Sequence, residues 1–597
     1  MKPIILSCNL IKQGLFILLF ISTAPILHAQ SWVWGKSGGG YDELSTGAQQ
    51  RQEEVYSIVT DSQGNSYVLS AVSKTGLSID GHSKTNYSDD TTKADMALTS
   101  FACDGSYRWS KIFGGGGYER IHPLQIDAQD NVYVAGRFGS CGIATVAYPP
   151  RIDNDIILTA TPTNCRLHFI TKFNSNGETI WFKQPQQAGL PSSENSKSAS
   201  LGFSVDALGN SYWLMVLPQG TYADGAFTNA LTNFNFNNVN STYFILKYDT
   251  TGAFVSATPL NIQSAGIYGA DMQFYRNANN GNFYLFTTNF NNPTATFTID
   301  GQTVTNSMLL ACLNPQGQLL WLRQNTTSSW GDTFIHNLAF DADNNIYFSG
   351  QGNSNTDVFL GLNVPGQWQV DGFVAKVNST ADTLLWSIYN NNLGARFGAI
   401  TVNNNEVAVT TNCFSANYMW GNQSIAVNGV NQGTQVLLAR FNKDTGSCLG
   451  LVNLPNNNAG YTDYGTAIAT DPAGDYLVGG GFGNFLYFDN NVSVLNSAAQ
   501  TDFFLAKYAA HACTLGTPST SSATAVLYPS PANNQLWIYG FDTARYQIYG
   551  LSGSLLLEGT YNGQQPIDSS PLANGCYLLQ IIHNDGQKST HKLLIQH

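Results

Sequence analysis

Short runs of alternating hydrophobic and polar residues, separated by turn residues, recur along the chain from residue 30 to residue 513. One recurrent sequence motif, here called the first phrase, places an aspartate or asparagine before a tight turn. A run rich in valine, isoleucine, tyrosine and phenylalanine follows the turn. Aspartate and asparagine side chains bond to their own backbone in turns, and β-branched and aromatic residues favour strands. Each copy therefore predicts a β-hairpin. The seven copies open at Asp61, Asp127, Asp206, Asn277, Asp341, Asn403 and Asp471.

A second phrase alternates with the first: an apolar strand, a turn that usually contains glycine, and a strand that tryptophan often opens. Two hairpins in each unit make four strands, and successive units start 62 to 79 residues apart. Compact propeller blades repeat every ~40–50 residues, so the excess length falls mainly into polar loops between the hairpins. Six copies of the second phrase run to Trp109, Trp181, Val255, Trp321, Trp386 and Leu451.

The seventh unit ends at Cys513 without the fourth strand that the other units carry. Residues 31–36 (Ser-Trp-Val-Trp-Gly-Lys) supply such a strand, and residues 34–43 parallel residues 109–119. An N-terminal strand that completes the last unit closes the ring and removes exposed sheet edges. The pattern therefore predicts an all-β fold, a seven-bladed β-propeller over residues 30–513 that the N-terminal strand closes.

The units resemble the bacterial seven-bladed propeller repeats known as SBBP repeats. The pattern of that family includes an Asp-x-x-Gly-Asn-x-Tyr-Val stretch, matched from Asp61 to Val68, and an Asp-x-Phe-x-x-Lys stretch, matched at residues 371–376 and 502–507. The sixth unit has lost its turn glycine and aromatic residue, and the third has lost its tryptophan. The resemblance implies a fold but no single activity, because one fold hosts many functions.

Residues 526–597 do not follow the repeat pattern, and they come after a Ser/Thr/Pro-rich linker at residues 514–525. Their short strands and polar turns predict a small Ig-like β-sandwich. The segment resembles the type A C-terminal sorting domain of the type IX secretion system of Bacteroidota, although Cys576 stands where such domains usually carry an apolar residue. The resemblance implies the secretion machinery as a partner, transport across the outer membrane, removal of the domain, and a place on the cell surface or outside the cell. It rests on Tyr528, Pro529, Pro531, Gly553, Gly575, Tyr577 and Lys592.

The N-terminus has the pattern of a signal peptide over residues 1–29. Lys2 and Lys12 precede an apolar stretch that is too short to span a bilayer comfortably, and Ala29 offers a small residue for cleavage. No later apolar run reaches ~18 residues, so we expect no transmembrane segment in the mature chain. The net charge is −12, with only 11% charged residues. Because there is no basic surplus to neutralise phosphates, we expect no nucleic-acid partner.

Eight of the nine cysteines remain after the expected cleavage, and export makes disulfides available to them. Their wide spacing contains no Cys-x-x-Cys or Cys/His metal pattern, so we expect no metal site and no cofactor. The pairing of Cys141 with Cys165 is favoured first and that of Cys448 with Cys513 second. Buried free thiols are the alternative.

The repeat itself separates structural from functional residues, because a residue present in most units serves every unit. By this criterion the turn aspartates, the strand-opening tryptophans and the basic residues on the third strands are structural. The segment from Asp341 to Asn345 has a faint calcium-loop pattern but lacks the glycine and the distal glutamate of such loops. Repeated tryptophans also dock the blades of quinoprotein propellers, but nothing else in the chain supports a quinone.

Two groups of residues break the repeat. The candidates for acid–base catalysis are Glu119, Arg120 and His122, which place both signs of charge and a histidine at the start of one strand. The inserts at residues 229–243 and 417–433 mix aromatic and amide side chains, which suits the stacking and hydrogen bonding of sugars. The ligand-binding candidates in these inserts are Phe234, Phe236, Tyr418 and Trp420.

Three classes of function remain. The leading interpretation is a non-catalytic binding module, secreted or on the cell surface, that takes a glycan or protein at one mouth of the ring. The alternatives are a carbohydrate-active surface enzyme on a propeller scaffold and a structural surface-layer component. The chain has no Gly-x-Ser-x-Gly, His-Glu-x-x-His or phosphate-binding motif, so catalysis is the less favoured interpretation.

Overall fold

A computed structural model describes most of the chain from Gln30 to His597. Its regular elements are β-strands together with one short 3-10 helix, η1 (Ala223–Gly225), so the chain is nearly all-β, as the sequence predicts. No helix among the described residues is long and apolar enough to cross a membrane. The residues left undescribed are 1–29, 42–52, 88–93, 118, 140–146, 159–166, 186–197, 237–238, 265–271, 288–296, 307, 327–333, 353–357, 364–370, 391–397, 404, 414–416, 427–433, 457–462, 484, 489–492, 496–500, 511–512, 514–525, 529–531, 540–542, 551–553, 564 and 583–587.

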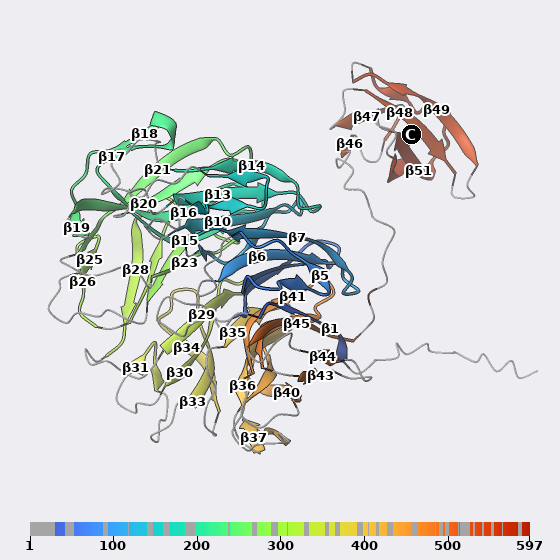
Figure 1. Ribbon diagram of the computed structural model, residues 1–597. Helices are drawn as coiled ribbons and strands as arrows, with labels where there is room; N and C mark the ends of the chain where they lie inside the picture. The colour runs from blue at the N-terminus through green and yellow to red at the C-terminus, as the bar shows by residue number, and fades with distance from the viewer. Residues whose placement is uncertain are drawn as a thin grey trace, which may run out of the picture.

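Seven antiparallel sheets, here numbered in chain order, share one order of strands in the described residues. Figure 1 labels strands of these sheets, coloured from blue to orange along the chain. Sheets 1 to 3 are built from β2 (Val55–Thr60), β3 (Ser66–Val72), β6 (Asp95–Phe101) and β7 (Tyr107–Gly114); from β8 (Arg120–Ile121) with β9 (Gln125–Ile126), β10 (Val132–Phe138), β13 (Leu167–Phe173) and β14 (Thr179–Lys183); and from β15 (Ala199–Val205), β16 (Ser211–Pro218), β20 (Val239–Tyr248) and β21 (Phe254–Leu260).

Sheets 4 to 7 follow the same order. They are built from β23 (Gln273–Arg276), β24 (Phe283–Thr287), β27 (Leu309–Leu313) and β28 (Leu319–Gln324); from β29 (Phe334–Phe340), β30 (Ile346–Gly352), β33 (Asp371–Val377) and β34 (Leu384–Tyr389); from β35 (Ala399–Val402), β36 (Glu406–Cys413), β39 (Gln435–Asn442) and β40 (Cys448–Leu454); and from β41 (Tyr464–Thr470), β42 (Tyr476–Phe482), β45 (Asp502–Ala509) and β1 (Ser31–Gly39).

Short strands occupy many of the connections and extend some of the sheets. They are β4 (Ser78–Ile79), β5 (His82–Ser83), β11 (Arg151–Ile152), β12 (Ile156–Ile157), β17 (Gly220–Tyr222), β18 (Phe227–Asn229), β19 (Phe234–Phe236), β22 (Ile262–Ser264), β25 (Phe297–Ile299), β26 (Gln302–Val304), β31 (Val358–Phe359), β32 (Leu362–Asn363), β37 (Asn417–Trp420), β38 (Gln423–Ala426), β43 (Phe485–Tyr487) and β44 (Ser493–Leu495).

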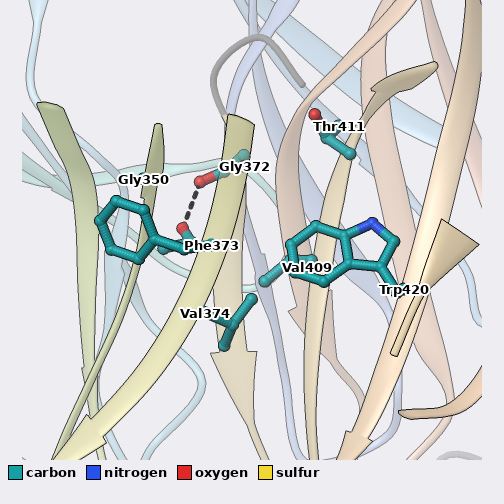
Figure 2. A pocket seen from close by; sticks show the side chains of 9 residues that line it. Gly350, Gly372, Phe373, Val374, Val409, Thr411 and Trp420 are labelled. Atoms are coloured by element: carbon teal, nitrogen blue, oxygen red, sulfur yellow. Dashed lines mark hydrogen bonds between the residues drawn. The ribbon is translucent and has the colours of Figure 1, made fainter. Parts of the chain in front are cut away.

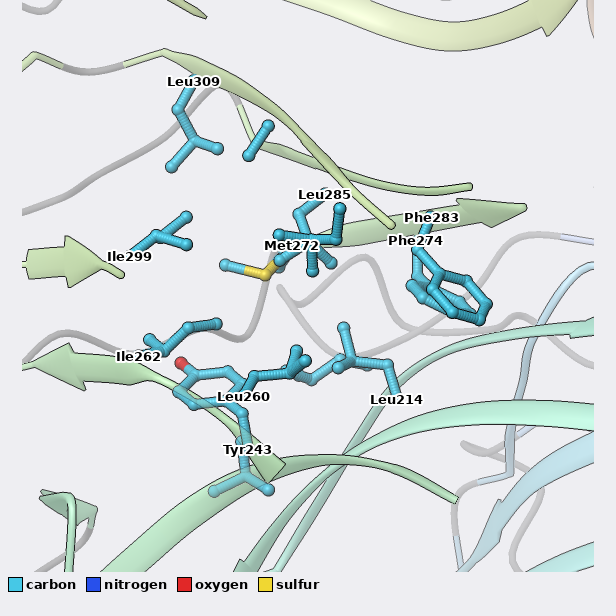
Figure 3. Packing of buried hydrophobic residues seen from close by; sticks show 14 of the residues in the cluster. Leu214, Tyr243, Leu260, Ile262, Met272, Phe274, Phe283, Leu285, Ile299 and Leu309 are labelled. Atoms are coloured by element: carbon cyan, nitrogen blue, oxygen red, sulfur yellow. The ribbon is translucent and has the colours of Figure 1, made fainter. Parts of the chain in front are cut away.

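The hydrophobic core of these sheets is divided into seven clusters, and each cluster draws its residues from two successive sheets. Figure 3 shows the cluster between sheets 3 and 4, where Leu214 and Tyr243 face Phe274 and Leu285. The last cluster joins sheet 7 to sheet 1. Since the strands alternate buried residues between two faces, each sheet packs on both its predecessor and its successor.

The first strand of the chain belongs to the last sheet. β1 pairs with β45 from Ser31↔Ala509 to Gly38↔Phe503, with a bulge between Trp32 and Trp34. The bulge sends the two indoles into different clusters, Trp32 between sheets 6 and 7 and Trp34 between sheets 7 and 1. Thr60 Oγ1 also donates to Thr470 O at 2.9 Å across the junction of sheets 7 and 1.

The junction of sheets 7 and 1 carries the disulfide of the described residues, Cys103–Cys513, which joins positions 410 residues apart. The predicted pairing of Cys448 with Cys513 is therefore wrong, and Cys448 is a buried free thiol. The sequence argument favoured cysteines that lie closer along the chain, whereas the sheet order brings the turn after β6 next to the end of β45. Cys141 and Cys165 lie outside the described residues.

Four of the recurrent tryptophans connect an outer strand to the next sheet. Trp34 Nε1 donates to Cys103 O at 3.1 Å, and three further indoles make the equivalent bond to the turn of the following sheet. A turn glycine lies under each of these rings, and at Gly177 (φ 82°) a Cβ would come within 2.6 Å of the Trp109 ring. The tryptophans thus have the packing role that their recurrence predicts.

Residues 526–597 form two small sheets around a core of their own. One contains β46 (Val526–Tyr528), β47 (Gln535–Tyr539) and β50 (Ile567–Asp568); the other has the order β49 (Leu555–Tyr561), β48 (Ala544–Tyr549), β51 (Gly575–Ile582) and β52 (Lys588–Ile595). Leu536, Ile548 and Leu579 are fully buried between them. Two small sheets with a shared core stand where the sequence predicts a small β-sandwich.

Candidate functional site

Sheets 2 and 5 carry the same complete polar cluster at the end where the first two strands meet in a turn, and we call it the turn cluster. In sheet 5 it consists of Asp341, Tyr347, Lys376 and Trp386. One oxygen of Asp341 accepts turn amides, while the other accepts the Tyr347 hydroxyl at 2.8 Å and faces Lys376 Nζ at 3.5 Å. The Trp386 ring lies 6.0 Å from the Tyr347 ring.

The turn cluster holds its carboxylate in the charged form. Burial acts to raise the pKa of Asp341, but hydrogen bonds from Asn345 and Tyr347 and the charge of Lys376 outweigh it and lower that pKa. Protein donors occupy both carboxylate oxygens. Sheet 2 repeats the arrangement with Asp127, whose carboxylate lies 3.1 Å from Lys172 Nζ. These aspartates therefore act as turn and strand anchors.

Sheet 6 replaces every member of the turn cluster. Strand register places Ala408 opposite Arg440, and Arg440 opposite Gly450. The equivalent pairs in sheet 5 are Tyr347 opposite Lys376 and Lys376 opposite Trp386. Asn403 stands where five of the six other sheets open with aspartate. A tyrosine and a tryptophan are thus replaced by alanine and glycine, which vacates space between sheets 6 and 7.

A different set of polar side chains enters that space. Tyr476, from sheet 7, donates its hydroxyl hydrogen to Glu406 Oε2 at 2.7 Å and accepts from Asn403 Nδ2 at 3.1 Å. Arg440 Nη1 lies 3.4 Å from the same Glu406 oxygen, and its guanidinium covers the Tyr508 ring at 5.8 Å. Burial, followed by the hydrogen bond to Glu406, raises the pKa of Tyr476, so its hydroxyl remains a donor.

A polar cavity of about 340 Å³ opens beside this set, between the turns of sheets 6 and 7. Its carboxylates are already paired, Glu406 with Arg440 and Asp471 with Lys507 at 2.8 Å. Gln30 Oε1 is buried at its edge without a hydrogen-bond partner. The cavity therefore presents hydrogen-bond acceptors with little net charge. It is lined by Gln30, Asn403, Asn405, Glu406, Asp471, Pro472, Ala473 and Gly474.

Three of the aromatic ligand-binding candidates lie in the hydrophobic cores between sheets. Tyr418 and Trp420 are almost completely buried, and Phe234 packs on Tyr243 with ring centroids 5.0 Å apart. The crevice that Trp420 lines with Phe373 and Val409, shown in Figure 2, has about 10 Å³, room for about one water molecule. The structure places these three rings where they cannot stack on a sugar. The side chain of Phe236 lies outside the described residues.

The catalytic candidates lie in different surroundings. Glu119 is buried, whereas Arg120 is exposed on β8. The ring of His122 meets Ser200 of sheet 3, and Ser200 Oγ also accepts from Trp213 Nε1 at 2.6 Å. His122 therefore links two sheets. His168, interpreted as scaffold, likewise bonds to Ser198 at 3.0 Å.

Acidic residues at the start of the first strand anchor the loops at the opposite end of the sheets. Asp463 accepts the amide of Gly483 at 2.8 Å and the side-chain amide of Asn456. Burial raises the pKa of Asp463 to about 6. Glu53 accepts the amides of Gly40 and Ser73, and burial followed by the charge of Asp502 raises its pKa. These groups recur between units and hold the loops in place.

We expect the substitution Asp463→Asn to weaken the pH dependence of stability between pH ~4 and ~6. The native state binds a proton at Asp463 more tightly than the unfolded chain does, so the free energy of unfolding falls as pH rises through this window and is flat above it. A shift of this size corresponds to about 2–3 kcal/mol. Urea unfolding at pH 4 and pH 7 measures the difference, with the exposed Asp343→Asn as the control. Equal slopes in the variant and the unchanged protein would contradict the assignment.

Sequence reasoning did not single out the cavity residues. The losses in the sixth unit were visible, but Arg440 was aligned with the lysines of the third strands and interpreted as structural, and Gly450 was not aligned with the tryptophans. The entry of Tyr476 from the next sheet was not visible, because it depends on packing between sheets. Within the described residues, no group of three His, Cys, Asp or Glu side chains could hold a metal ion.

Comparisons with known proteins give one family and several distant structures. Residues 526–596 match the family described as "Secretion system C-terminal sorting domain". None of the curated proteins compared matches the chain. Among solved structures, a protein of unknown function from Dyadobacter fermentans is similar at 10% identity, covering 64% of this chain and 94% of that one, with a TM-score of 0.33.

Two further structures are similar at the same level. The β-propeller domain of Cps50 (Swd1) from Myceliophteria thermophila shares 8% identity, covers 76% of this chain and 97% of its own, and has a TM-score of 0.33. The polysaccharide lyase Uly1 shares 9% identity over 81% and 100% of the two chains, with a TM-score of 0.38. At these scores the similarities carry no argument about activity. The match at residues 526–596 marks the chain as a substrate of type IX secretion, exported across the outer membrane to the cell surface or the extracellular space.

Proposed function

We propose that this protein is an exported seven-bladed β-propeller that binds a glycan or protein ligand without catalysis. In this proposal residues 1–29 are a signal peptide, residues 30–513 are an SBBP-type ring that β1 closes, and the Bacteroidota are the source. The order of strands in the seven sheets, the pairing of β1 with β45, and the cluster shared by sheets 7 and 1 support a closed ring.

The observation that carries the binding role is the substitution of the turn cluster in sheet 6. A structural cluster that sheets 2 and 5 carry in full is replaced there by small residues and by Glu406 and Arg440, and a polar cavity opens at the surface between sheets 6 and 7. Ligand sites are concave, and their polar groups fix the orientation of the ligand. A purely structural ring would gain packing from keeping the tyrosine and the tryptophan.

A glycan-array screen of the chain from Gln30 to His597 tests this proposal. Saturable binding to a related set of glycans, with the glycans recovered intact, is the expected result. Cleavage of a bound glycan would favour a surface enzyme. An array without binding, together with self-assembly of the purified protein into sheets or fibres, would contradict the proposal and favour a surface-layer component.

A further inference from the structure

We infer that the cavity between sheets 6 and 7 binds one uncharged sugar residue, by hydrogen bonds from the hydroxyl groups of the sugar. This inference rests on the proposed binding function and names the site and the ligand class. Nothing in the sorting-domain match assigns a ligand to this part of the chain.

The size and the polarity of the cavity favour a small hydroxylated ligand. Its volume of about 340 Å³ lies at the small end of the ~300–1,000 Å³ typical of ligand pockets. The lining residues offer carboxylate and amide oxygens as acceptors, and Gln30 Oε1 is a buried acceptor without a partner. A buried acceptor without a donor is unfavourable, so a ligand that donates a hydrogen bond gains affinity there.

The charges favour a neutral ligand over an ionic one. Among the described residues, no lysine, arginine or histidine side chain lines the cavity. The proposed cleavage before Gln30 would add one α-amino group at its edge, and the glucuronate probe tests whether an anion binds there. Both carboxylates already hold a cation: Glu406 lies 3.4 Å from Arg440, and Asp471 lies 2.8 Å from Lys507. An amine would have to compete with these ion pairs, whereas hydroxyl groups bond to the remaining lone pairs of the carboxylates.

A comparison with sheet 3 indicates that the opening in sheet 6 is not a simple consequence of losing a tryptophan. Sheet 3 also lacks the tryptophan, since Ser256 stands opposite Lys247. There Tyr212 is retained, and Arg276 from sheet 4 covers its ring at 4.8 Å. Sheet 6 has lost the tyrosine as well, and the residues that enter leave polar atoms along a cavity instead of filling it.

The experiment is isothermal titration of the chain from Gln30 to His597 with galactose, mannose, fucose and N-acetylglucosamine. Putrescine and glucuronate serve as the cationic and anionic probes. The Asn405→Ala and Asn403→Ala variants each remove a lining amide. The matched control is Asp343→Ala, at the equivalent turn position of sheet 5, where the side chain is exposed.

We expect at least one neutral sugar to bind. Each cavity variant should weaken binding about tenfold or more, because the loss of one hydrogen bond of ~1.4 kcal/mol lowers the affinity by a factor of ten. The control variant should leave binding unchanged. Binding of putrescine or glucuronate in place of the sugars would overturn the ligand class. Unchanged sugar binding by both cavity variants would overturn the site and leave the proposed function standing. If no sugar binds and the glycan array also shows no binding, the inference and glycan recognition fail together.

Discussion

A chain that starts at residue 42, and so lacks β1, is expected to lose the cooperative unfolding of the seven sheets. β1 pairs with β45 along most of its length and buries Trp32 and Trp34 in two separate clusters. Removing a buried tryptophan side chain costs about 3–5 kcal/mol. Two such losses are comparable with the whole stability of a typical domain, about 5–15 kcal/mol. The edge of β45 would also lie open to pairing with other chains.

Circular dichroism during heating, together with size-exclusion chromatography, measures this effect. The informative control is Cys103→Ser, which keeps β1 and removes only the disulfide to Cys513. This variant is expected to unfold cooperatively with about 2–5 kcal/mol less stability. If the chain without β1 instead remains monomeric and unfolds at the same temperature as the intact chain, β1 is not needed to hold sheets 6, 7 and 1 together.

The strands could be predicted from the sequence because their signals are local. Each turn aspartate bonds to amides two and four residues ahead, as Asp61 does with Gln63 and Asn65, so one short phrase specifies a turn and the start of a strand. Repetition then supplied the count of units. The pairing of β1 with β45 was also foreseeable, since an unpaired strand stood at each end of the repeat.

The cysteine pairing failed because it depends on contact between sheets and not on a local phrase. Cys103 lies in the turn between β6 and β7, and its carbonyl oxygen accepts the indole N–H of Trp34. The strand that carries Trp34 also runs beside β45, so the turn of Cys103 comes close to Cys513, with the two Cα atoms 5.8 Å apart. Proximity along the chain carries no information about this contact.

The aromatic inserts show a second limit. Composition could not distinguish a ring exposed for a ligand from a ring that covers a core. Tyr418 and Trp420 lie on β37, which pairs with β38, and both rings are buried with residues of sheets 5 and 6. The cavity between sheets 6 and 7 instead accompanies the loss of a tyrosine and a tryptophan at Ala408 and Gly450, two positions outside its lining. Small residues carry no chemical signature in a sequence.

A chain that ends at residue 587, and so lacks β52, is expected to accumulate in the periplasm instead of crossing the outer membrane. β52 pairs with β51 from Gly575↔Ile595 to Ile582↔Lys588, and it buries Leu593 and Ile595 in the core of the C-terminal sheets. Its loss removes one of four strands from the larger sheet and opens that core to water. Because this segment is the sorting domain, export should fail with its fold.

Cell fractionation and protease treatment of intact cells measure where each chain accumulates. The variant Lys592→Ala separates the fold of the domain from recognition of one side chain, because Lys592 is exposed on β52 while its neighbour Leu593 is buried. Export of Lys592→Ala with retention of the truncated chain would show that the machinery needs the folded sheet. Retention of both the truncated chain and the Lys592→Ala variant would show that the secretion machinery recognises Lys592, as the resemblance of the terminus implies. Arrival of the truncated chain at the cell surface would contradict the dependence of export on β52.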